Sequence, residues 1–145
     1  MYSGATDFGK RLLMDALSQD PDLSIAQKAI KNFKNATAMK EQAGVVFKEQ
    51  KFQEAIDMFD KCLAFDHLNL AFNSIINLNK SIALGKLGKN DESLKCLNIS
   101  LQMNPEYAKA LVKRAEINSN LKYYDEAVRD LSKAKEIDPT GNNVD

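Results

Sequence analysis

The chain has 145 residues, of which 44% are hydrophobic, a share typical of a folded globular domain rather than of a disordered chain. Its twenty basic and twenty acidic residues cancel, so the net charge provides no general attraction to nucleic acid or to an anionic membrane, and neither partner is expected. Three prolines, six glycines and no tryptophan supply little turn chemistry for a many-stranded sheet, so the composition favours an all-α fold.

The N-terminal third predicts two helical segments. Residues 12–21, Leu-Leu-Met-Asp-Ala-Leu-Ser-Gln-Asp-Pro, have the pattern of a second helix that a proline ends, so we interpret 1–23 as the remnant of a preceding repeat. A long helix is then predicted from about 24 to near 50, in which 24–35 form a linking helix. The apolar residues that support this helix are Ile25, Ala29, Phe33 and Ala36.

Three segments of the remaining chain share one pattern of small and large residues. They are 36–69, 74–107 and 108–141, with four extra residues, 70–73, after the first. The small positions, two in each segment, hold Ala43 and Ala55, Ser81 and Ser93, and Ala115 and Ala127. The large position of each second helix holds Phe59, Leu97 and Leu131. Small residues let two helices cross closely, so each segment predicts an antiparallel helical hairpin.

Two prolines define the length of the repeat. Pro105 and Pro139 stand 34 positions apart and each ends a second helix, whereas His67 occupies that position in the first segment and is interpreted as a loop residue. A helix-turn-helix unit of this period is the signature of the tetratricopeptide repeat. The chain therefore resembles a right-handed superhelical solenoid of helical hairpins. We expect a fragment of a longer array, in which the tail 142–145 follows the last unit and uncapped apolar end faces allow self-association.

The first helices of such a stack line its concave surface, so their polar residues are available to a ligand. Four stand out: Lys40 in the first unit, Asn79 in the second, and Lys109 and Lys113 in the third, the last two on one helix face. They occur in Met-Lys-Glu-Gln-Ala-Gly-Val-Val-Phe-Lys, Leu-Asn-Lys-Ser-Ile-Ala and Ala-Lys-Ala-Leu-Val-Lys-Arg-Ala. These segments resemble the three helices that form the carboxylate clamp of tetratricopeptide co-chaperones.

The resemblance implies that these four residues hold the carboxylates of Glu-Glu-Val-Asp, the C-terminal sequence of the seventy- and ninety-kilodalton heat-shock chaperones. At the fifth clamp position the family carries Asn, and here Gly44 offers no side-chain donor. Lys113 stands where the family usually carries Arg, whose planar fork grips a carboxylate with two hydrogen bonds. Phe47 and Ile82 are expected to form apolar walls, with Lys86 as a further donor.

The long joint after the first unit and the long helix before it look most like the repeat region of J-domain co-chaperones. The similarity covers roughly residues 10–141. No His-Pro-Asp tripeptide occurs in this chain, so the J domain itself is absent from it, and if the parent protein has one, it is expected to follow residue 145.

Two other interpretations of the groove stay open. It could bind client polypeptides or act as a scaffold through apolar concave residues such as Phe47 and Ile82, without recognising a carboxylate. Alternatively, the chain's own ending, Asn-Asn-Val-Asp, could occupy the clamp of a neighbouring molecule, because it shares its last two residues with the expected ligand.

Catalysis, cofactors and metals are not expected. Acidic residues do not converge in pairs, no Gly-rich phosphate loop occurs, and no nucleophile has a base at motif spacing. Cys62 and Cys96 form neither a Cys-x-x-Cys pair nor a Cys/His cluster, so we assign them to helix packing. With no apolar run of roughly 20 residues and no signal-peptide pattern, we expect a soluble protein in the reducing cytoplasm.

Overall fold

The computed structural model describes residues 9–12, 14, 24–65 and 69–141. Its longer helices are α2 (Ser24–Lys48), α3 (Phe52–Leu63), α4 (Leu70–Lys86), α5 (Asn90–Met103), α6 (Ala108–Asn120) and α7 (Tyr124–Ile137). The described part of the chain contains no strand, and the prediction of an all-α fold is confirmed. The predicted loop at His67 and the tail 142–145 lie outside the described residues, as does most of the predicted remnant 1–23.

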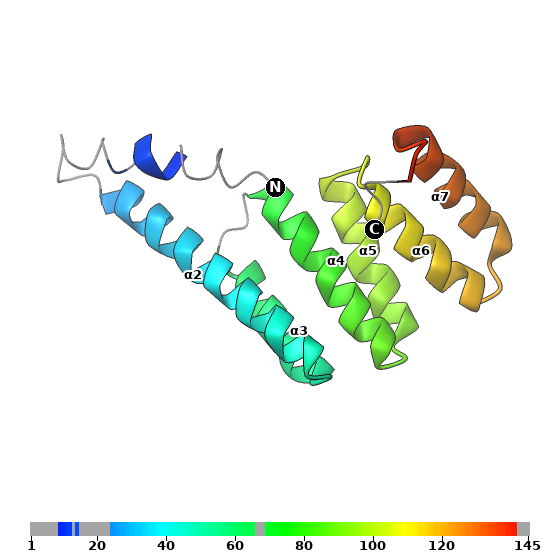
Figure 1. Cartoon of the computed structure of the whole chain (residues 1–145), viewed down its shortest axis with the longest axis horizontal. Coiled ribbons are helices and arrows are strands. Elements are labelled where there is room, and N and C mark those ends of the chain that lie inside the picture. Colours follow the sequence, from blue (N-terminus) through cyan, green and yellow to red (C-terminus); the bar gives the residue numbers. More distant parts are fainter. Residues whose placement is uncertain (1–8, 13, 15–23, 66–68, 142–145) are drawn as a thin grey trace.

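The helices pair into three antiparallel hairpins that stand side by side in chain order, α2–α3, α4–α5 and α6–α7 (Figure 1). Successive hairpins pack through α3 on α4 and through α5 on α6. This arrangement confirms the predicted solenoid of the tetratricopeptide kind. The repeat limits 36–69, 74–107 and 108–141 stay a proposal about the sequence units that these hairpins represent.

The same turn joins the two helices of every hairpin. Its middle residue has a left-handed backbone, with φ of 65° at Gln50, 75° at Gly88 and 67° at Lys122. In each turn the amide of the next residue donates to a carbonyl five residues earlier: Lys51 to Val46 (3.2 Å), Lys89 to Leu84 (2.9 Å) and Tyr123 to Asn118 (2.7 Å). Only Gly88 is the residue type that this φ favours, so hairpin packing imposes the turn on the other two.

The predicted small positions are buried inside the hairpins. Ala43, Ala55, Ser81 and Ser93 are fully buried, Ala115 is 1% exposed and Ala127 5% exposed. In the middle hairpin the Ser93 hydroxyl donates to the carbonyl of Ser81 at 2.7 Å, so a small polar residue at this crossing is satisfied by the facing backbone. Burial at all six positions and the contact between Ser93 and Ser81 agree with the prediction of close helix crossings.

A second pair of serines joins the other end of the α4–α5 hairpin. The Ser74 hydroxyl donates to the carbonyl of Ser100 at 3.1 Å, and the Ser100 hydroxyl donates to the carbonyl of Ser74 at 2.8 Å. Both side chains are fully buried. This reciprocal pair anchors α4, the helix that contributes Asn79 and Ile82 to the groove described below.

The four residues that interrupt the repeat, 70–73, form the first turn of α4. Asn69 caps this turn, because its side-chain oxygen accepts a hydrogen bond of 3.1 Å from the amide of Phe72. The ring of Phe72 lies 6.5 Å from that of Phe33 in the linking part of α2. The extra turn therefore supports the long helix α2 where it extends beyond α3 (Figure 1).

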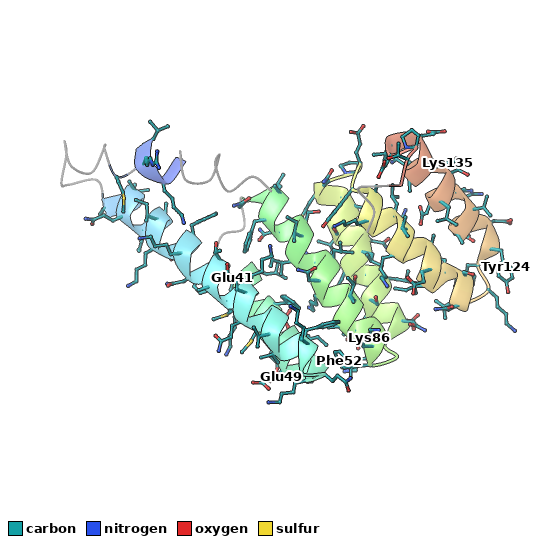
Figure 2. The ribbon with its side chains drawn as sticks, in the orientation of Figure 1. Glu41, Glu49, Phe52, Lys86, Tyr124 and Lys135 are labelled. Atoms are coloured by element: carbon teal, nitrogen blue, oxygen red, sulfur yellow. The ribbon has the colours of Figure 1, made fainter. Side chains whose placement is uncertain are left out.

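The last hairpin exposes its outer face. Phe59 and Leu97 occupy the large positions of the first two units and are buried, whereas Leu131 is 49% exposed. Val128 and Tyr124 are also exposed on α7, and Figure 2 shows Tyr124 at the outer edge of the helix, away from the other hairpins. None of the described helices is both long and apolar enough to cross a bilayer.

Candidate peptide-binding site

The four polar residues predicted to contact a ligand line one cavity of about 600 Å³. Lys40 comes from α2, Asn79 from α4, and Lys109 and Lys113 from α6, so the first helices of the three hairpins meet here. We call this space the cationic cavity. The rest of its lining consists of Ile75, Leu78, Ile82, Tyr107, Val112 and Glu116.

Core packing determines which side of α6 faces this cavity. Ala110 and Leu111 are at most 1% exposed and pack in the apolar core between the second and third hairpins. Lys109 and Lys113 lie four residues apart and therefore share the opposite, open side of the helix. Asn79 is half-buried beside the buried Leu78, at the base of the same space. Several donors thus surround an open volume with an apolar base.

Glu116 is a lining residue that the sequence reasoning missed. Its carboxylate accepts a hydrogen bond of 2.9 Å from the Lys113 ammonium group, and the two side chains are 57% and 28% exposed. Residues three apart on a helix are neighbours, so this spacing alone could have indicated the ion pair. An exposed pair of this kind contributes only about 0.2–1 kcal/mol. A ligand carboxylate can therefore replace Glu116 on Lys113.

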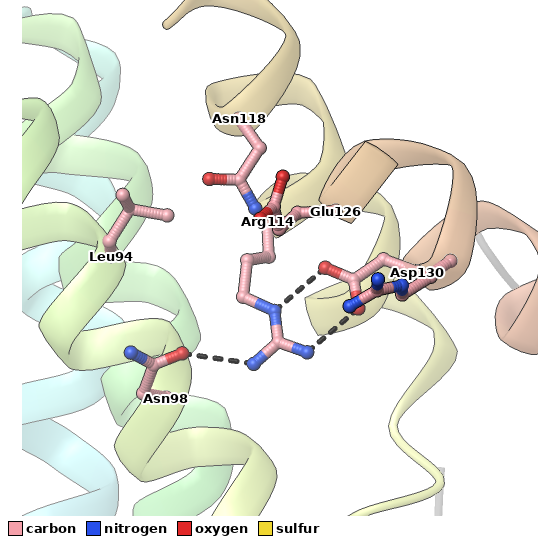
Figure 3. Close-up of a pocket in the computed structure, with 7 residues that line it drawn as sticks. Leu94, Asn98, Arg114, Asn118, Glu126 and Asp130 are labelled. Carbon is pink, nitrogen blue, oxygen red and sulfur yellow. Dashed lines mark hydrogen bonds and ion pairs between the residues drawn. The ribbon is translucent and has the colours of Figure 1, made fainter. Parts of the chain in front are cut away.

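Arg114 lies on the far side of α6, as its position next to Lys113 predicts. Its Nε and Nη2 atoms donate to the two carboxylate oxygens of Asp130, each at 2.7 Å, and Nη1 donates to Asn98 at 2.9 Å (Figure 3). The hydrogen bonds to Asp130 are the main cause that raises the pKa of Arg114 above its ordinary value. Arg114 thereby joins α6 to α7 and α5 and does not line the cationic cavity.

A second cavity of about 370 Å³ adjoins the first. We call it the apolar recess. Gly44, Phe47 and Phe59 line it together with Lys40, Asn79 and Ile82, which also line the cationic cavity, and Glu41 and Lys48 complete the lining. The ring of Phe47 meets that of Phe52 edge to face, with centroids 5.1 Å apart, and Phe59 is 3% exposed. The aromatic walls of the recess are therefore held by the core.

Gly44 is not required by the fold. It lies inside α2, and a Cβ atom built there would meet nothing within 4 Å. Glycine in a helix interior costs about 0.5–1 kcal/mol relative to alanine, because it loses more backbone freedom on folding. The residue thus opens space in the groove without a structural need for it.

Lys86 has a different position from the other predicted contacts. It is exposed and lines a smaller space of about 140 Å³ next to the cationic cavity, which it shares with Lys113 and Glu116. Phe47 likewise lines the recess rather than the cationic cavity, whereas Ile82 borders all three spaces.

The two cysteines lie in the core. Burial raises the pKa of the Cys62 thiol to about 11 and also raises that of Cys96, so both groups are held in the unreactive protonated form. The Cys62 thiol donates to the carbonyl of Ala36 at 3.6 Å. Within the described ranges no group of three or more His, Cys, Asp or Glu side chains could hold a metal ion.

Comparisons with known proteins agree with this architecture. Residues 108–140 match the profile of the tetratricopeptide repeat. The chain is 30% identical to the DnaJ homolog subfamily C member 7 homolog of Dictyostelium discoideum, in an alignment that covers 90% of this chain and 24% of that protein. It is 27% identical to DnaJ homolog subfamily C member 7 of Homo sapiens, in an alignment that covers 96% of this chain and 28% of that protein. The chain thus spans about a quarter of the length of these relatives.

A solved structure shares the same fold. It is the first tetratricopeptide domain of Spaghetti (RPAP3) bound to the HSP90 peptide SRMEEVD. The similarity has a TM-score of 0.68 with 26% sequence identity, and covers 77% of this chain and 85% of that chain.

Proposed function

We propose that this chain, which is a tetratricopeptide-repeat array, is the docking module of a co-chaperone and binds the acidic C-terminal peptide of a heat-shock chaperone. The observation that carries the proposal is the cationic cavity, where Lys40, Asn79, Lys109 and Lys113 surround one space. In this role the chain is a protein-interaction module without a catalytic site. The cytoplasmic location, the absence of nucleic-acid and membrane partners, and self-association stay predictions.

The chemistry of a chain terminus suits this cavity. A C-terminal Asp offers two carboxylates close together, and the three lysines supply ammonium donors for them while Asn79 supplies an amide. Hydrogen bonds to charged groups contribute about 1.5–3 kcal/mol each, so several contacts together with some apolar burial can reach the roughly 8 kcal/mol of micromolar affinity. The similarity to a Spaghetti (RPAP3) domain bound to the HSP90 peptide SRMEEVD supports this ligand class.

Titration with an acidic peptide tests the proposal directly. We expect a peptide ending in Glu-Glu-Val-Asp to bind with micromolar affinity. Its affinity should fall as salt rises, because the Debye length, over which charges interact, shortens from about 8 Å at physiological ionic strength to about 3 Å at 1 M. Isothermal titration calorimetry at several salt concentrations measures both effects. The control is the same peptide with an amidated C-terminus, which removes one carboxylate. If the amide binds as tightly as the acid, the chain does not recognise a terminus.

Glu116→Gln should strengthen the same binding. The change removes the acid that pairs with Lys113 and leaves the lysine free for the ligand. Because an exposed ion pair contributes about 0.2–1 kcal/mol, the affinity for the acidic peptide should rise by a factor of about 1.4 to 5. Glu136→Gln, an exposed acid on α7 that lines no described cavity, makes the same charge change and should leave the affinity unaltered. Equal gains in both variants would show that only net charge matters.

The apolar recess supports a second candidate function, the binding of client polypeptides along the groove. Its aromatic walls, Phe47 and Phe59, could hold apolar segments of an unfolded chain without any contact to a terminus. In that case affinity would not depend on salt or on Lys109, but would be lost when Phe47 is replaced by a polar residue. The titration above distinguishes the two candidates, since they predict opposite responses to salt and to amidation.

A further inference from the structure

We propose that a polar pocket on the outer side of the third hairpin binds the side-chain carboxamide of a glutamine or asparagine in a partner polypeptide. The pocket has a volume of about 290 Å³ and lies between α5, α6 and α7 (Figure 3). We call it the outer pocket. Its lining includes Leu94 and Asn98 from α5, Arg114 and Asn118 from α6, and Asp130 from α7. It shares no lining residue with the cationic cavity or the apolar recess, so this inference goes beyond the proposed function and does not depend on it.

Two different faces of α6 line the two spaces. Lys109 and Lys113 line the cationic cavity, whereas Arg114 and Asn118 line the outer pocket. Residues four apart share one face of a helix, and consecutive residues point about 100° apart. A peptide bound in the groove therefore does not occupy the outer pocket.

The turns of the hairpins show that Asn118 stands at a core position. In each turn an amide donates to a carbonyl five residues earlier, and these carbonyls belong to Val46, Leu84 and Asn118. Val46 and Leu84 are apolar core residues, 8% and 2% exposed. Asn118 is also 8% exposed, yet it carries an amide. The third hairpin thus has a polar group where the other two place an apolar side chain.

The junction between the first two hairpins has a packed apolar cluster at the place that corresponds to the outer pocket. The residues of this cluster are at most 7% exposed, and they are Ile56, Ala83, Leu84 and Cys96. Three of them, Ile56, Leu84 and Cys96, correspond in the repeat to Leu94, Asn118 and Asp130 of the next junction. The second junction therefore replaces part of an apolar core with polar side chains that surround an open space.

The side-chain amide of Asn118 has no hydrogen-bond partner among the described residues. It lies on the α6 wall of the pocket, beside Arg114 (Figure 3). Burying an amide without a hydrogen bond is unfavourable, and buried polar groups in folded proteins are nearly always paired. Packing does not require the amide, since Leu84 fills the equivalent position. A bound group that pairs with Asn118 accounts for its presence.

The charges of the outer pocket cancel. Arg114 is paired with Asp130, and the remaining acid and base, Glu126 and Arg129, are exposed on α7. Two cations and two anions leave no net charge that would attract an ion. A neutral polar group therefore suits the pocket better than a carboxylate or an ammonium group.

A side-chain carboxamide is the neutral group that matches Asn118. The amide of Asn has an oxygen that accepts and a nitrogen that donates, so a second carboxamide can exchange two hydrogen bonds with it. Because Asn118 is 8% exposed, only a slim group that projects from a chain reaches it. Glutamine and asparagine side chains project in this way, and the half-buried Leu94 offers apolar surface to their methylene groups. The main chain of the partner then stays at the mouth of the pocket.

Nuclear magnetic resonance with small probes tests the inference. The probes are the N-acetyl N-methylamides of glutamine, glutamate and glycine, which share their main-chain amides and differ only in the side chain. We expect the glutamine probe to shift the side-chain amide signals of Asn118 in the isotope-labelled chain and to saturate in the millimolar range. The glutamate probe has nearly the same shape but no amide donor, so it should bind at least about fivefold more weakly.

The glycine probe separates the two sources of an amide. It has main-chain amides but no side chain, so it should cause no saturable shift. If it shifts the Asn118 signals as strongly as the glutamine probe, the pocket binds main chain and the assignment to a side-chain carboxamide is wrong. If no probe saturates, the pocket holds only solvent and the inference is overturned.

A competition experiment tests whether the outer pocket is a separate site. A peptide ending in Glu-Glu-Val-Asp should not displace the glutamine probe, because the outer pocket and the cationic cavity have no lining residue in common. Displacement would contradict a second site. Retention of the probe supports it whether or not the acidic peptide binds, so failure of the proposed function and failure of this inference are distinguishable.

Asn118→Leu gives the third hairpin the residue of the second and supplies the matched variant. It should abolish the shifts that the glutamine probe causes at the backbone amides of Asn98 and Glu126, which still report on the pocket when the Asn118 amide is gone. Because a buried amide without a partner is removed, the variant should also unfold at a temperature higher by about 2 °C or more.

Asn35→Leu is the control for this variant. It makes the same change at an exposed site of α2 that lines no described cavity, so it reproduces the helix propensity of leucine and should keep probe binding. The gain in unfolding temperature should be larger for Asn118→Leu than for Asn35→Leu. If Asn118→Leu instead lowers the unfolding temperature, Asn118 serves the fold and the inference fails.

Discussion

Lys109→Glu should reduce the affinity for an acidic C-terminal peptide by about 10- to 100-fold. Lys109 is exposed on the open side of α6 and lines the cationic cavity with Lys40 and Lys113. The change removes a hydrogen bond to a charged group, which contributes about 1.5–3 kcal/mol, and introduces a carboxylate that repels those of the ligand. Each 1.4 kcal/mol corresponds to a tenfold change in affinity, which sets the expected range.

The control for this prediction is Lys133→Glu. Lys133 is exposed on α7 and lines none of the described cavities, yet its replacement changes the net charge by the same amount. Calorimetric titration of both variants with the Glu-Glu-Val-Asp peptide separates a contact from a general charge effect. We expect Lys133→Glu to bind like the unmodified chain and to retain its salt dependence. A loss of similar size in both variants would contradict the assignment of Lys109 to a specific site.

Asp130→Ala should destabilise the fold by about 2–3 kcal/mol. Asp130 is 6% exposed and accepts two hydrogen bonds from Arg114, so its removal leaves a partly buried guanidinium group without its main partner. Breaking a fully buried ion pair costs about 3–5 kcal/mol, and the lower value applies here because the Arg114 side chain is 27% exposed and water can replace part of the interaction. Urea unfolding followed by circular dichroism measures the loss.

A double-mutant cycle assigns this loss to the ion pair. Arg114→Met combined with Asp130→Leu replaces both charges with apolar groups, and such replacements are often neutral when the volume is retained. The double variant should therefore lose less stability than the sum of the two single variants. Asn98→Ala removes only the outer hydrogen bond to Arg114 and should cost at most about 1 kcal/mol. Additive losses in the cycle would mean that Arg114 and Asp130 stabilise the fold independently.

Much of the fold could be predicted from residue spacing, because the repeat imposes the same packing three times. Ala43, Ser81 and Ala115 recur with the small residues of the second helices, and close helix crossings at these positions require them. The left-handed backbone of the turns could not be predicted from residue spacing. Gln50 and Lys122 are not residues that favour a positive φ, and only the packing of the hairpins makes them adopt it.

The candidate site also has one part that the sequence could predict and another that depends on how the hairpins stack. Helical periodicity was sufficient to predict that Lys109 and Lys113 share a face and that Arg114 points elsewhere. That Lys40 and Asn79 line the same cavity as these lysines depends on how three hairpins stack, which spacing within one helix cannot show. Phe47 and Ile82 were predicted as apolar walls, but the contribution of Phe59 to the recess was not, because Phe59 lies on the second helix of its hairpin and meets them only in the folded chain.

The order of residues along the chain thus specified the helices, their hairpin pairing and the set of polar side chains on the inner faces. These features depend on interactions between residues a few positions apart, or on a period that repeats in the sequence. The tertiary structure alone decided that three inner faces converge on one cationic cavity, and that Phe59 of α3 and Ile82 of α4 meet beside Gly44 of α2. Such contacts join distant segments, and their geometry arises only when the apolar core brings the hairpins together.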